Sequence, residues 1–242
     1  MSETLLEVDQ VSKRFGGFVA LSQVSLTVRT GERLGIIGPN GSGKTTLINC
    51  ICGALVSDGG SIGFGGTDVT RLAAHRRARL GIARSFQVPR PFSSMTLAEN
   101  IAVPLEYVAH HRSLHRADVS VEARAILALM GLAERADAPT GSLTQVDLRK
   151  LELARALAVR PRLLILDEVM AGLSPVEVDE MLVIILDLSR QGVTIVMIEH
   201  IMRAIMRFSE RVICLDAGRI MAEGTPAQIV QDRDVQRIYL GD

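Results

Sequence analysis

Residues 38–45 read Gly38-Pro39-Asn40-Gly41-Ser42-Gly43-Lys44-Thr45, a full match to the pattern G-x-x-x-x-G-K-[ST]. They leave a compact apolar run, Arg33–Gly38, and enter a segment with helical character, Lys44–Gly53. Glycines let backbone N–H groups wrap closely around phosphates, and the following helix adds its positive amino-terminal end. Lys44 supplies a cation for the β- and γ-phosphates, and the Thr45 hydroxyl can ligate Mg²⁺. We expect a nucleotide, ATP with Mg²⁺, to be bound by Gly38, Pro39, Asn40, Gly41, Ser42, Gly43, Lys44, Thr45 and Thr46.

A second apolar run ends in two carboxylates, Asp167 and Glu168, after Leu163-Leu164-Ile165-Leu166. Open α/β sheets place their ligands at the carboxyl ends of strands, which is where these two acids are expected. Asp167 is placed to hold Mg²⁺ through its water shell, and Glu168 is placed to orient or deprotonate the attacking water. By itself such a strand end is often structural. Its pairing with the glycine-rich loop favours a Walker B element.

The remaining apolar patterns predict strands on both sides of a helical block. Short strands are expected at Thr4–Val8 and Ser25–Val28, joined through the Gly16-Gly17 turn region, and a glycine-rich hairpin is expected at Gly59–Gly66. Helical spacing dominates from about Pro89 to Arg160, and strands return at Leu163–Asp167, Val193–Glu199 and Arg211–Asp216. This order predicts one α/β domain over residues 1–242, with an inserted helical subdomain at about residues 89–160.

Charge and hydropathy narrow the possible partners. Lys+Arg and Asp+Glu both number 27, so the formal net charge is zero and gives no electrostatic case for nucleic acid as the main partner. The apolar runs fall far short of the roughly 20 residues that span a membrane, and the first residues lack a secretory signal pattern. Three cysteines are too few for a disulfide framework and are expected as buried thiols. We therefore expect a cytoplasmic protein.

The order of motifs resembles the ATP-binding subunits of ABC transporters, a group of P-loop NTPases, over essentially all 242 residues. The resemblance implies an ABC-type ATPase domain with a mixed sheet, an antiparallel β subdomain and the inserted helical subdomain. It also implies roles at five more places. These are Phe15 stacked on adenine, Gln87 contacting Mg²⁺ and the attacking water, Thr144 in the signature segment Leu143–Asp147, the D-loop Ala171–Ser174, and His200 contacting the γ-phosphate.

Each of these positions also has a simpler interpretation. Phe15 could be an ordinary packing residue, Gln87 a surface amide, and His200 a structural histidine after a buried strand. For Ser174 the simpler interpretation is the strongest, because Ser174-Pro175-Val176-Glu177 is typical of a capping box with proline at the first helical position.

Two segments depart from the family pattern. The signature usually reads Leu-Ser-Gly-Gly-Gln, whereas here Thr144 retains a hydroxyl, Val146 replaces a glycine and Asp147 adds a negative charge. A β-branched residue makes a positive φ costly, and a carboxylate beside a phosphate is unfavourable unless it points away. After Glu168, Val169-Met170 replaces the usual proline and small residue. Nucleotide binding is therefore a safer expectation than fast hydrolysis.

The resemblance implies a mechanism and a set of partners. Two such domains face head to tail and trap two ATP molecules, each between one subunit's phosphate loop and the other's signature segment. Closure moves transmembrane permease subunits through the Q-loop and the helical subdomain, so the chain is expected on the cytoplasmic face of the membrane. Three segments resemble subunits of branched-chain amino-acid importers, in which a solute-binding protein acts indirectly: Arg84–Phe92, Met95–Asn100 and the tail Ile238–Asp242.

Two other functions stay open from the residues alone. One is a degenerate subunit that binds ATP, hydrolyses it weakly and works beside a second ATPase. The other is a soluble ABC ATPase acting on DNA or ribosomes, for which the sequence has no tandem domain or basic extension. A basic stretch before the Q-loop favours a solvated face or contact with anionic lipid, with a nucleic-acid face as a weaker alternative. It comprises Arg71, His75, Arg76, Arg77, Arg79 and Arg84.

Overall fold

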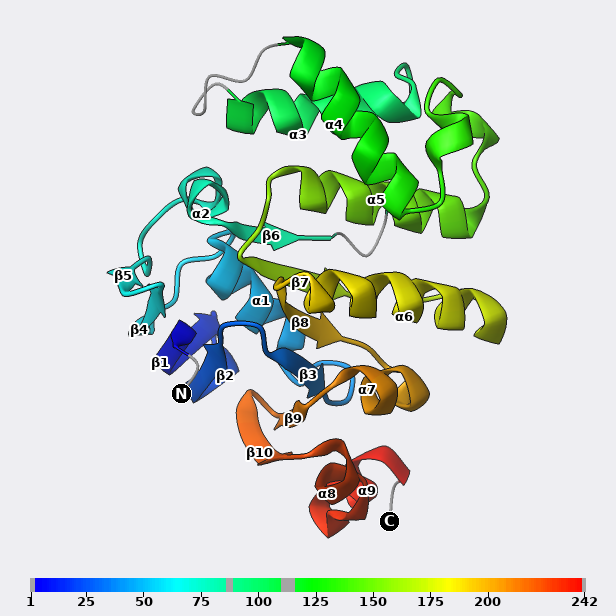
Figure 1. Cartoon of the computed structure of the whole chain (residues 1–242). Coiled ribbons are helices and arrows are strands. Elements are labelled where there is room, and N and C mark those ends of the chain that lie inside the picture. Colours follow the sequence, from blue (N-terminus) through cyan, green and yellow to red (C-terminus); the bar gives the residue numbers. More distant parts are fainter. Residues whose placement is uncertain (1–2, 86–88, 110–115, 241–242) are drawn as a thin grey trace.

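The computed structural model describes residues 3–85, 89–109 and 116–240, which form two sheets and a group of helices (Figure 1). A six-stranded sheet has the order β10-β9-β3-β8-β7-β6, and a four-stranded sheet has the order β2-β1-β4-β5. The strands of the first sheet are β3 (Arg33–Ile37), β6 (Ile82–Arg84), β7 (Leu163–Asp167), β8 (Thr194–Ile198), β9 (Arg211–Asp216) and β10 (Arg219–Gly224). Those of the second are β1 (Thr4–Phe15), β2 (Phe18–Arg29), β4 (Gly59–Phe64) and β5 (Thr67–Asp68).

The six-stranded sheet is mixed, as predicted. Strands β9, β3, β8, β7 and β6 run parallel to one another, and β10 pairs antiparallel with β9 at one edge. Side chains alternate between its two faces, so both faces are apolar. Leu163 and Ile165 belong to one buried cluster, while Leu164 and Leu166 belong to the other. Such runs of buried residues are typical of parallel strands covered on both sides.

The four-stranded sheet is antiparallel and has longer strands than the sequence patterns predicted. Strands β1 and β2 have 12 residues each and continue to the Gly16-Gly17 turn, beyond the predicted end at Val8. The prediction was too short because register shifts after Val8 interrupt the regular alternation of buried residues. Strands β6 and β10 were not predicted, since both are edge strands with weak apolar patterns, and β6 has only three residues.

Helices cover both sheet faces and form a third group beside them. Their bounds are α1 (Lys44–Cys52), α2 (Ala74–Leu80), α3 (Leu97–Ala109), α4 (Arg116–Leu129), α5 (Gln145–Ala158), α6 (Pro175–Arg190), α7 (Met202–Phe208), α8 (Pro226–Gln231) and α9 (Arg233–Leu240). Helix α1 packs into the cluster shared with the antiparallel sheet through Leu47, Ile48 and Ile51. Within the described ranges, every helix is too short or too polar to cross a membrane.

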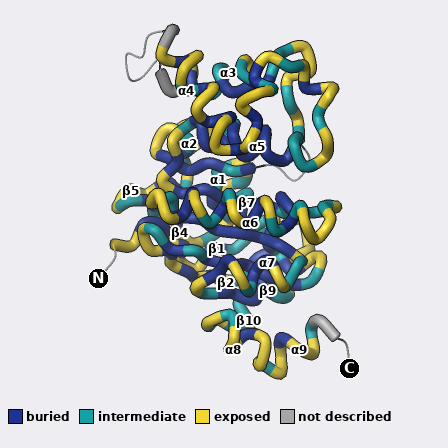
Figure 2. Tube along the Cα trace, turned by 45° about the vertical axis from the view of Figure 1, so that its right-hand side comes forward, coloured by how far each residue is buried: buried dark blue, intermediate teal, exposed yellow. Residues whose placement is uncertain are grey.

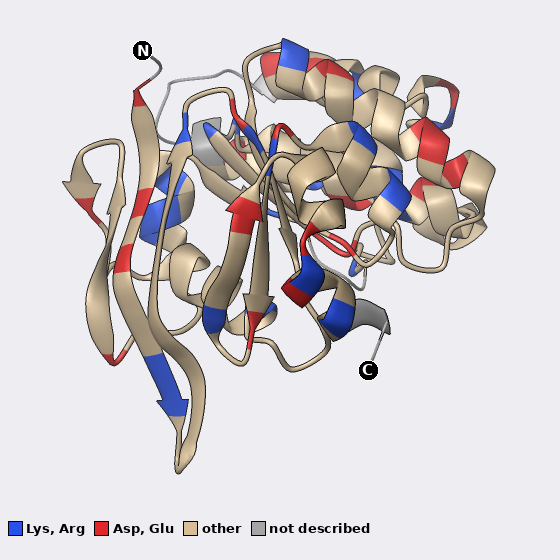
Figure 3. Cartoon of the chain, turned by 90° about the horizontal axis from the view of Figure 1, so that it is seen from below, with Lys and Arg blue, Asp and Glu red and all other residues tan. Residues whose placement is uncertain are grey.

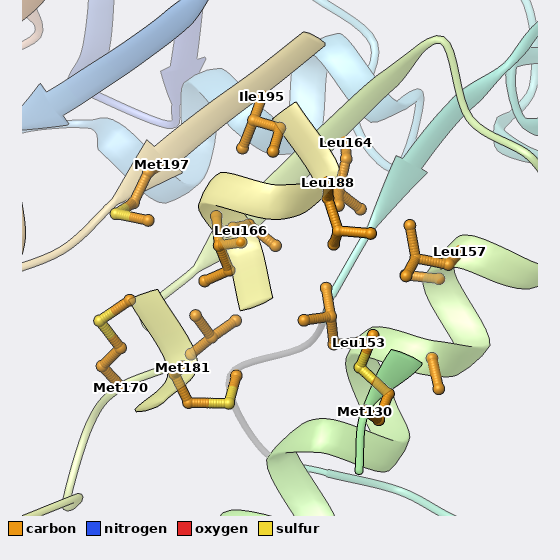
Figure 4. Packing of buried hydrophobic residues seen from close by; sticks show 14 of the residues in the cluster. Met130, Leu153, Leu157, Leu164, Leu166, Met170, Met181, Leu188, Ile195 and Met197 are labelled. Carbon is orange, nitrogen blue, oxygen red and sulfur yellow. The ribbon is translucent and has the colours of Figure 1, made fainter. Parts of the chain in front are cut away.

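The opposite face of the sheet joins the helical group through one continuous cluster. Leu164 and Met197 from the sheet belong to the same buried cluster as Leu188 of α6 and Leu157 of α5 (Figure 4). Buried residues follow the strands through the centre, whereas exposed residues lie along the outer sides of α3, α4, α8 and α9 (Figure 2). Because the cluster is continuous, α3, α4 and α5 are packed onto the sheet-covering layer.

The basic stretch before the Q-loop is a solvated face only in part, because Arg77 is buried. Arg77 is 1% exposed, and it donates to the backbone carbonyls of Leu72, Cys50, Ile51 and Thr70 at 2.6–2.9 Å. Its guanidinium therefore caps the carboxyl end of α1 and fastens α2 to it. Arg71, His75, Arg76 and Arg79 are exposed, as a solvated face requires. Elsewhere, basic and acidic residues are interspersed on the face seen in Figure 3.

We expect Arg77→Met to lower the free energy of unfolding by about 3–4 kcal/mol, because four backbone carbonyls, two of them in buried contacts, lose a donor worth about 1 kcal/mol each. Chemical denaturation of the two proteins measures the difference. Arg76→Met is the matched control, since Arg76 is exposed on the same helix, and we expect a change below about 0.5 kcal/mol. Equal effects of the two substitutions would contradict the capping role.

Candidate nucleotide site

The predicted phosphate loop and the two acids lie at one edge of the six-stranded sheet. Ile36 of β3 and Asp167 of β7 both pair with Ile198 of β8, so these three parallel strands end at the same level. The loop follows β3, Glu168 follows β7, and Glu199 and His200 follow β8. Three segments that the sequence places far apart are therefore brought to the edge at which open α/β sheets bind ligands.

The glycines of the loop are required by close backbone packing. A Cβ atom on Gly38 would lie 2.0 Å from the carbonyl oxygen of Leu215, and one on Gly43 would lie 2.6 Å from that of Ala20. Gly41 and Gly43 have φ of +80° and +105°, a region that favours glycine. At Gly41 nothing lies within 4 Å of a Cβ position, so the loop is open on that side.

The amino end of α1 suits an anion. Among the described residues, no side chain caps this end and no acidic residue lies in its first turn. The first N–H groups of a helix have no intrahelical partner, and here they face the loop. Lys44 Nζ donates to the carbonyls of Gly38 and Pro39 at 2.8 and 2.9 Å. Burial lowers the pKa of the Lys44 amine, and the carboxylates of Glu168 and Asp167 oppose that shift.

The residues present fit Mg²⁺ as well as a phosphate chain. Thr45 is exposed in the first turn of α1, and Asp167 lies at the end of β7 with a side chain 5% exposed. A hydroxyl and a carboxylate are the hard oxygen donors that Mg²⁺ prefers. Arg84 Nη2 also contacts Asp167 Oδ2 at 2.5 Å. The third expected ligand, Gln87, lies outside the described residues.

Glu168 and His200 form a contacting pair. His200 Nε2 lies 2.8 Å from Glu168 Oε1, and the Glu168 N–H donates to the carbonyl of Ile198. Glu168 has φ of +51°, a conformation that costs energy for a residue with a side chain. This backbone turn directs the carboxylate towards the histidine at the sheet edge. The pair is suited to hold a water molecule or an oxyanion.

Phe15 lies at the end of β1 with its side chain 48% exposed, which is unusual for a large apolar ring. Its cross-strand partner is Phe18, which is 61% exposed. Directly paired residues of an antiparallel sheet share a face, so the two rings lie together. The sequence interpretation missed Phe18, although the Gly16-Gly17 turn would have placed it opposite Phe15.

The altered signature segment is accommodated by local contacts. Thr144 Oγ1 caps α5 by accepting from the Asp147 N–H at 3.2 Å. Asp147 Oδ2 pairs with Arg135 Nη1 at 2.6 Å, so its charge has a partner within the chain. Val146 lies in the first turn of α5 and has no positive φ, which removes the expected backbone strain at this position.

The D-loop is held at both ends. Ser174 accepts from the Glu177 N–H while Glu177 Oε2 accepts from the Ser174 N–H, which is the predicted capping box of α6. Near the other end, Glu199 Oε1 accepts from the Met170 N–H at 2.8 Å, and Arg149 Nη2 donates to the Ala171 carbonyl at 3.2 Å. Glu199 and Arg149 were not singled out from the sequence. A glutamate directly after a buried apolar strand and beside His200 was the available signal.

Glu199 is 2% exposed, and its burial raises the pKa of its carboxyl to about 7. The Glu168 carboxylate acts in the same direction, while the Met170 and His200 N–H groups and the Arg149 guanidinium oppose it. The folded state therefore holds the proton more tightly than the unfolded chain. The stability contributed by the protonated carboxyl is complete below the ordinary pKa of 4.5 and is lost as the pH rises towards 7.

We expect Glu199→Gln to remove this dependence, because the amide is neutral at every pH and still offers an oxygen to Met170. The free energy of unfolding of the variant, minus that of the original chain, should rise by up to about 3 kcal/mol between pH 5 and pH 8. Denaturant titrations at several pH values measure it. A difference that stays constant with pH would contradict the raised pKa.

Known proteins with similar sequences carry ATP-binding descriptions. Residues 21–171 match the family model described as ABC transporter, and residues 219–242 match the model described as branched-chain amino acid ATP-binding cassette transporter. The high-affinity branched-chain amino acid transport ATP-binding protein BraF of Pseudomonas aeruginosa is 37% identical, with 100% of both chains covered. LivG of Salmonella typhimurium, which bears the same description, is 38% identical with the same coverage.

Solved structures with similar folds include two ATP-binding cassettes of ABC transporters. A nucleotide-free cassette is 31% identical with a TM-score of 0.89, over 99% of this chain and 100% of that one. The ADP conformation of the cassette MJ1267 is 30% identical with a TM-score of 0.88, over 100% of both chains.

Proposed function

Because the chain belongs to the ABC transporter family, as an ATP-binding and ATP-hydrolysing subunit, we propose that it powers the import of branched-chain or related amino acids through separate permease subunits. The observation that carries the ATPase part is the common edge of β3, β7 and β8, which gathers the phosphate loop, Asp167 and the Glu168–His200 pair. The amino-acid part rests on the full-length relatives and on the match of the tail at residues 219–242.

The phosphate loop binds and orients the nucleotide. Lys44 exchanges its contacts with the Gly38 and Pro39 carbonyls for phosphate oxygens, while the amino end of α1 offers its free N–H groups. Phe15, with Phe18 beside it, offers a flat apolar surface to the adenine ring. Gly41 stays within reach of the phosphates because nothing lies within 4 Å of a Cβ position there.

The Glu168–His200 pair prepares the attacking water. Glu168 orients the water and accepts its proton, while His200 holds Glu168 and meets the γ-phosphate. Mg²⁺ supplies charge neutralisation of the phosphates when it is bound, and Thr45, Gln87 and Asp167 are the residues that would hold it. The D-loop contacts of Glu199 and Arg149 fix the chain just after Glu168.

A second ATP-binding subunit completes the site. Thr144 and the amino end of α5 present the signature segment to the partner's ATP. Asp147 does not oppose that contact as a bare charge, because Arg135 pairs with it. The similarity to transport ATP-binding proteins favours this function over a weakly hydrolysing partner or a soluble ATPase acting on DNA or ribosomes.

Permease subunits would dock in a groove of about 470 Å³ between α2, α3 and α5, which we call the lateral groove. Its apolar wall is formed by Ala78, Ile82, Val103, Pro104, Ala156 and Val159. Val103 and Tyr107 of α3 are 37% and 38% exposed, so apolar surface is left uncovered there. An apolar helical segment of a permease fits such a surface, and docking would place this chain at the cytoplasmic face of the membrane.

We expect Glu168→Gln to lower the ATP turnover of the assembled transporter by at least about 100-fold, since general base catalysis contributes about 10²–10⁴-fold. Binding of ATP should be retained, because the phosphate loop is unchanged. Phosphate release and binding of a fluorescent ATP analogue measure the two properties. Asp137→Asn, on the exposed side of the helical group, serves as control. Equal turnover in Glu168→Gln and the original chain would overturn the assignment.

We expect Val103→Asp to reduce recovery of the permease subunits with the tagged chain by about 10-fold or more, because a buried unpaired carboxylate is costly. Val121→Asp on α4 is the matched control, as Val121 is 71% exposed outside the groove. Recovery from gently solubilised membranes is quantified by mass spectrometry. If both variants retain the permeases equally, the groove is not the docking surface.

A further inference from the structure

Arg84 joins three parts of the molecule at one guanidinium. It is the last residue of β6, the edge strand that pairs with β7. Its Nη1 donates to Asn49 Oδ1 at 2.6 Å, and its Nη2 contacts Asp167 Oδ2 at 2.5 Å. Asn49 lies on α1 one helical turn after Thr45, and Asp167 ends β7. The side chain thus bridges the phosphate-loop helix and the strand that carries the metal-binding acid.

The ion pair is buried enough to restrict Asp167. The side chains of Arg84 and Asp167 are 15% and 5% exposed, so water competes little for either charge. A guanidinium holds its donors in a rigid plane, and one that contacts both Asn49 and Asp167 has little freedom to turn. Because Arg84 takes one carboxylate oxygen, this contact restricts the orientation that the other oxygen can adopt.

The same side chain lines the lateral groove. Arg84 is part of its wall, together with the apolar residues of α2, α3 and α5. One arginine therefore meets the proposed docking surface on one side and the proposed magnesium ligand on the other. Arg155 also lines the lateral groove. Its guanidinium contacts Glu152, the Arg90 carbonyl and the Phe92 ring instead of a residue of the proposed magnesium site.

We propose that Arg84 is a positioning residue that orients the Asp167 carboxylate for Mg²⁺ and links that carboxylate to the occupant of the lateral groove. The link to the groove rests on the proposed function, whereas the effect on Asp167 belongs to the isolated chain. A segment that enters the groove and shifts Arg84 shifts Asp167 with it, because the guanidinium is bonded to the acid. Binding of a permease then changes the geometry of the magnesium site through one side chain.

If the Arg84–Asp167 ion pair served only to stabilise the fold, its removal would have a different effect on nucleotide binding. Its loss would weaken the fold and affect nucleotide binding equally with and without Mg²⁺. A positioning role concerns only the Mg²⁺-dependent part, because Arg84 contacts Asp167 and Asn49 rather than the phosphate loop itself. The two explanations are therefore separated by measuring nucleotide binding in both conditions.

The experiment titrates Mg²⁺ into the full chain in the presence of a fluorescent ATP analogue and records binding. For Arg84→Met we expect binding without Mg²⁺ to stay within about 2-fold of the original chain. The Mg²⁺ concentration for half-maximal effect should rise by about 10-fold or more, as is typical when a residue that orients a metal ligand is lost. Arg84→Lys keeps the charge without the planar fork, so its half-maximal Mg²⁺ concentration should lie between those of the original chain and Arg84→Met.

Arg33→Met is the matched control. Arg33 also contacts one carboxylate and one carbonyl, Glu210 Oε1 and the Phe208 oxygen, both at 2.8 Å, but at the other end of β3. Its Mg²⁺ dependence should equal that of the original chain. An unchanged Mg²⁺ dependence in Arg84→Met, or equal losses with and without Mg²⁺, would overturn the positioning role.

The link to the groove is tested in the purified complex with permease subunits. We expect docking to change the half-maximal Mg²⁺ concentration of the original chain by about 3-fold or more, and to leave Arg84→Met unchanged. A shift of the same size in both proteins, or in neither, would overturn the link. If the original chain retains no permease at all, the proposed transport function is wrong. The Mg²⁺ titration of the isolated chain still tests whether Arg84 positions Asp167.

Discussion

The close contact between the backbone of the phosphate loop and two neighbouring strands is the constraint on which the site depends. Gly38 lies against the Leu215 carbonyl of β9, and Gly43 lies against the Ala20 carbonyl of β2, at separations that exclude a side chain. Gly218 meets Ala20 in the same way, and its N–H donates to the Ser42 carbonyl. The loop is thereby shaped by the sheets that surround it, and its N–H groups remain directed at the open side.

Buried arginines connect this rigid loop to the rest of the chain. Arg77 satisfies carbonyls at the end of α1, Arg84 joins α1 to β7, and Arg149 joins α5 to the segment after Glu168. In each case the guanidinium donates to neutral oxygens or to a carboxylate, which offsets part of the cost of removing a charge from water. The elements that we propose to bind phosphate, metal and the partner's nucleotide are consequently held to one another by polar contacts as well as by apolar packing.

The altered signature illustrates how a local charge can be absorbed by tertiary contacts. Asp147 would repel a phosphate if it faced one alone, but its carboxylate is bonded to Arg135. Thr144 uses its hydroxyl to cap α5, and Val146 has an ordinary helical conformation. The backbone N–H groups at this helix end, rather than the replaced side chains, are what the segment can offer to a phosphate.

The sequence by itself determined the parts of this protein that depend on local chemistry. The glycine-rich loop, the strand ending in Asp167 and Glu168, the capping box at Ser174 and the mixed α/β architecture all follow from short patterns whose physical requirements are local. The length of β1 and β2 did not, because register shifts between paired strands hide the alternation. Only the tertiary structure buried Arg77, paired Asp147 with Arg135 and set Arg84 between Asn49 and Asp167. These features arise from contacts between residues distant in the chain, and a charged side chain acquires its partner only when the fold removes it from water.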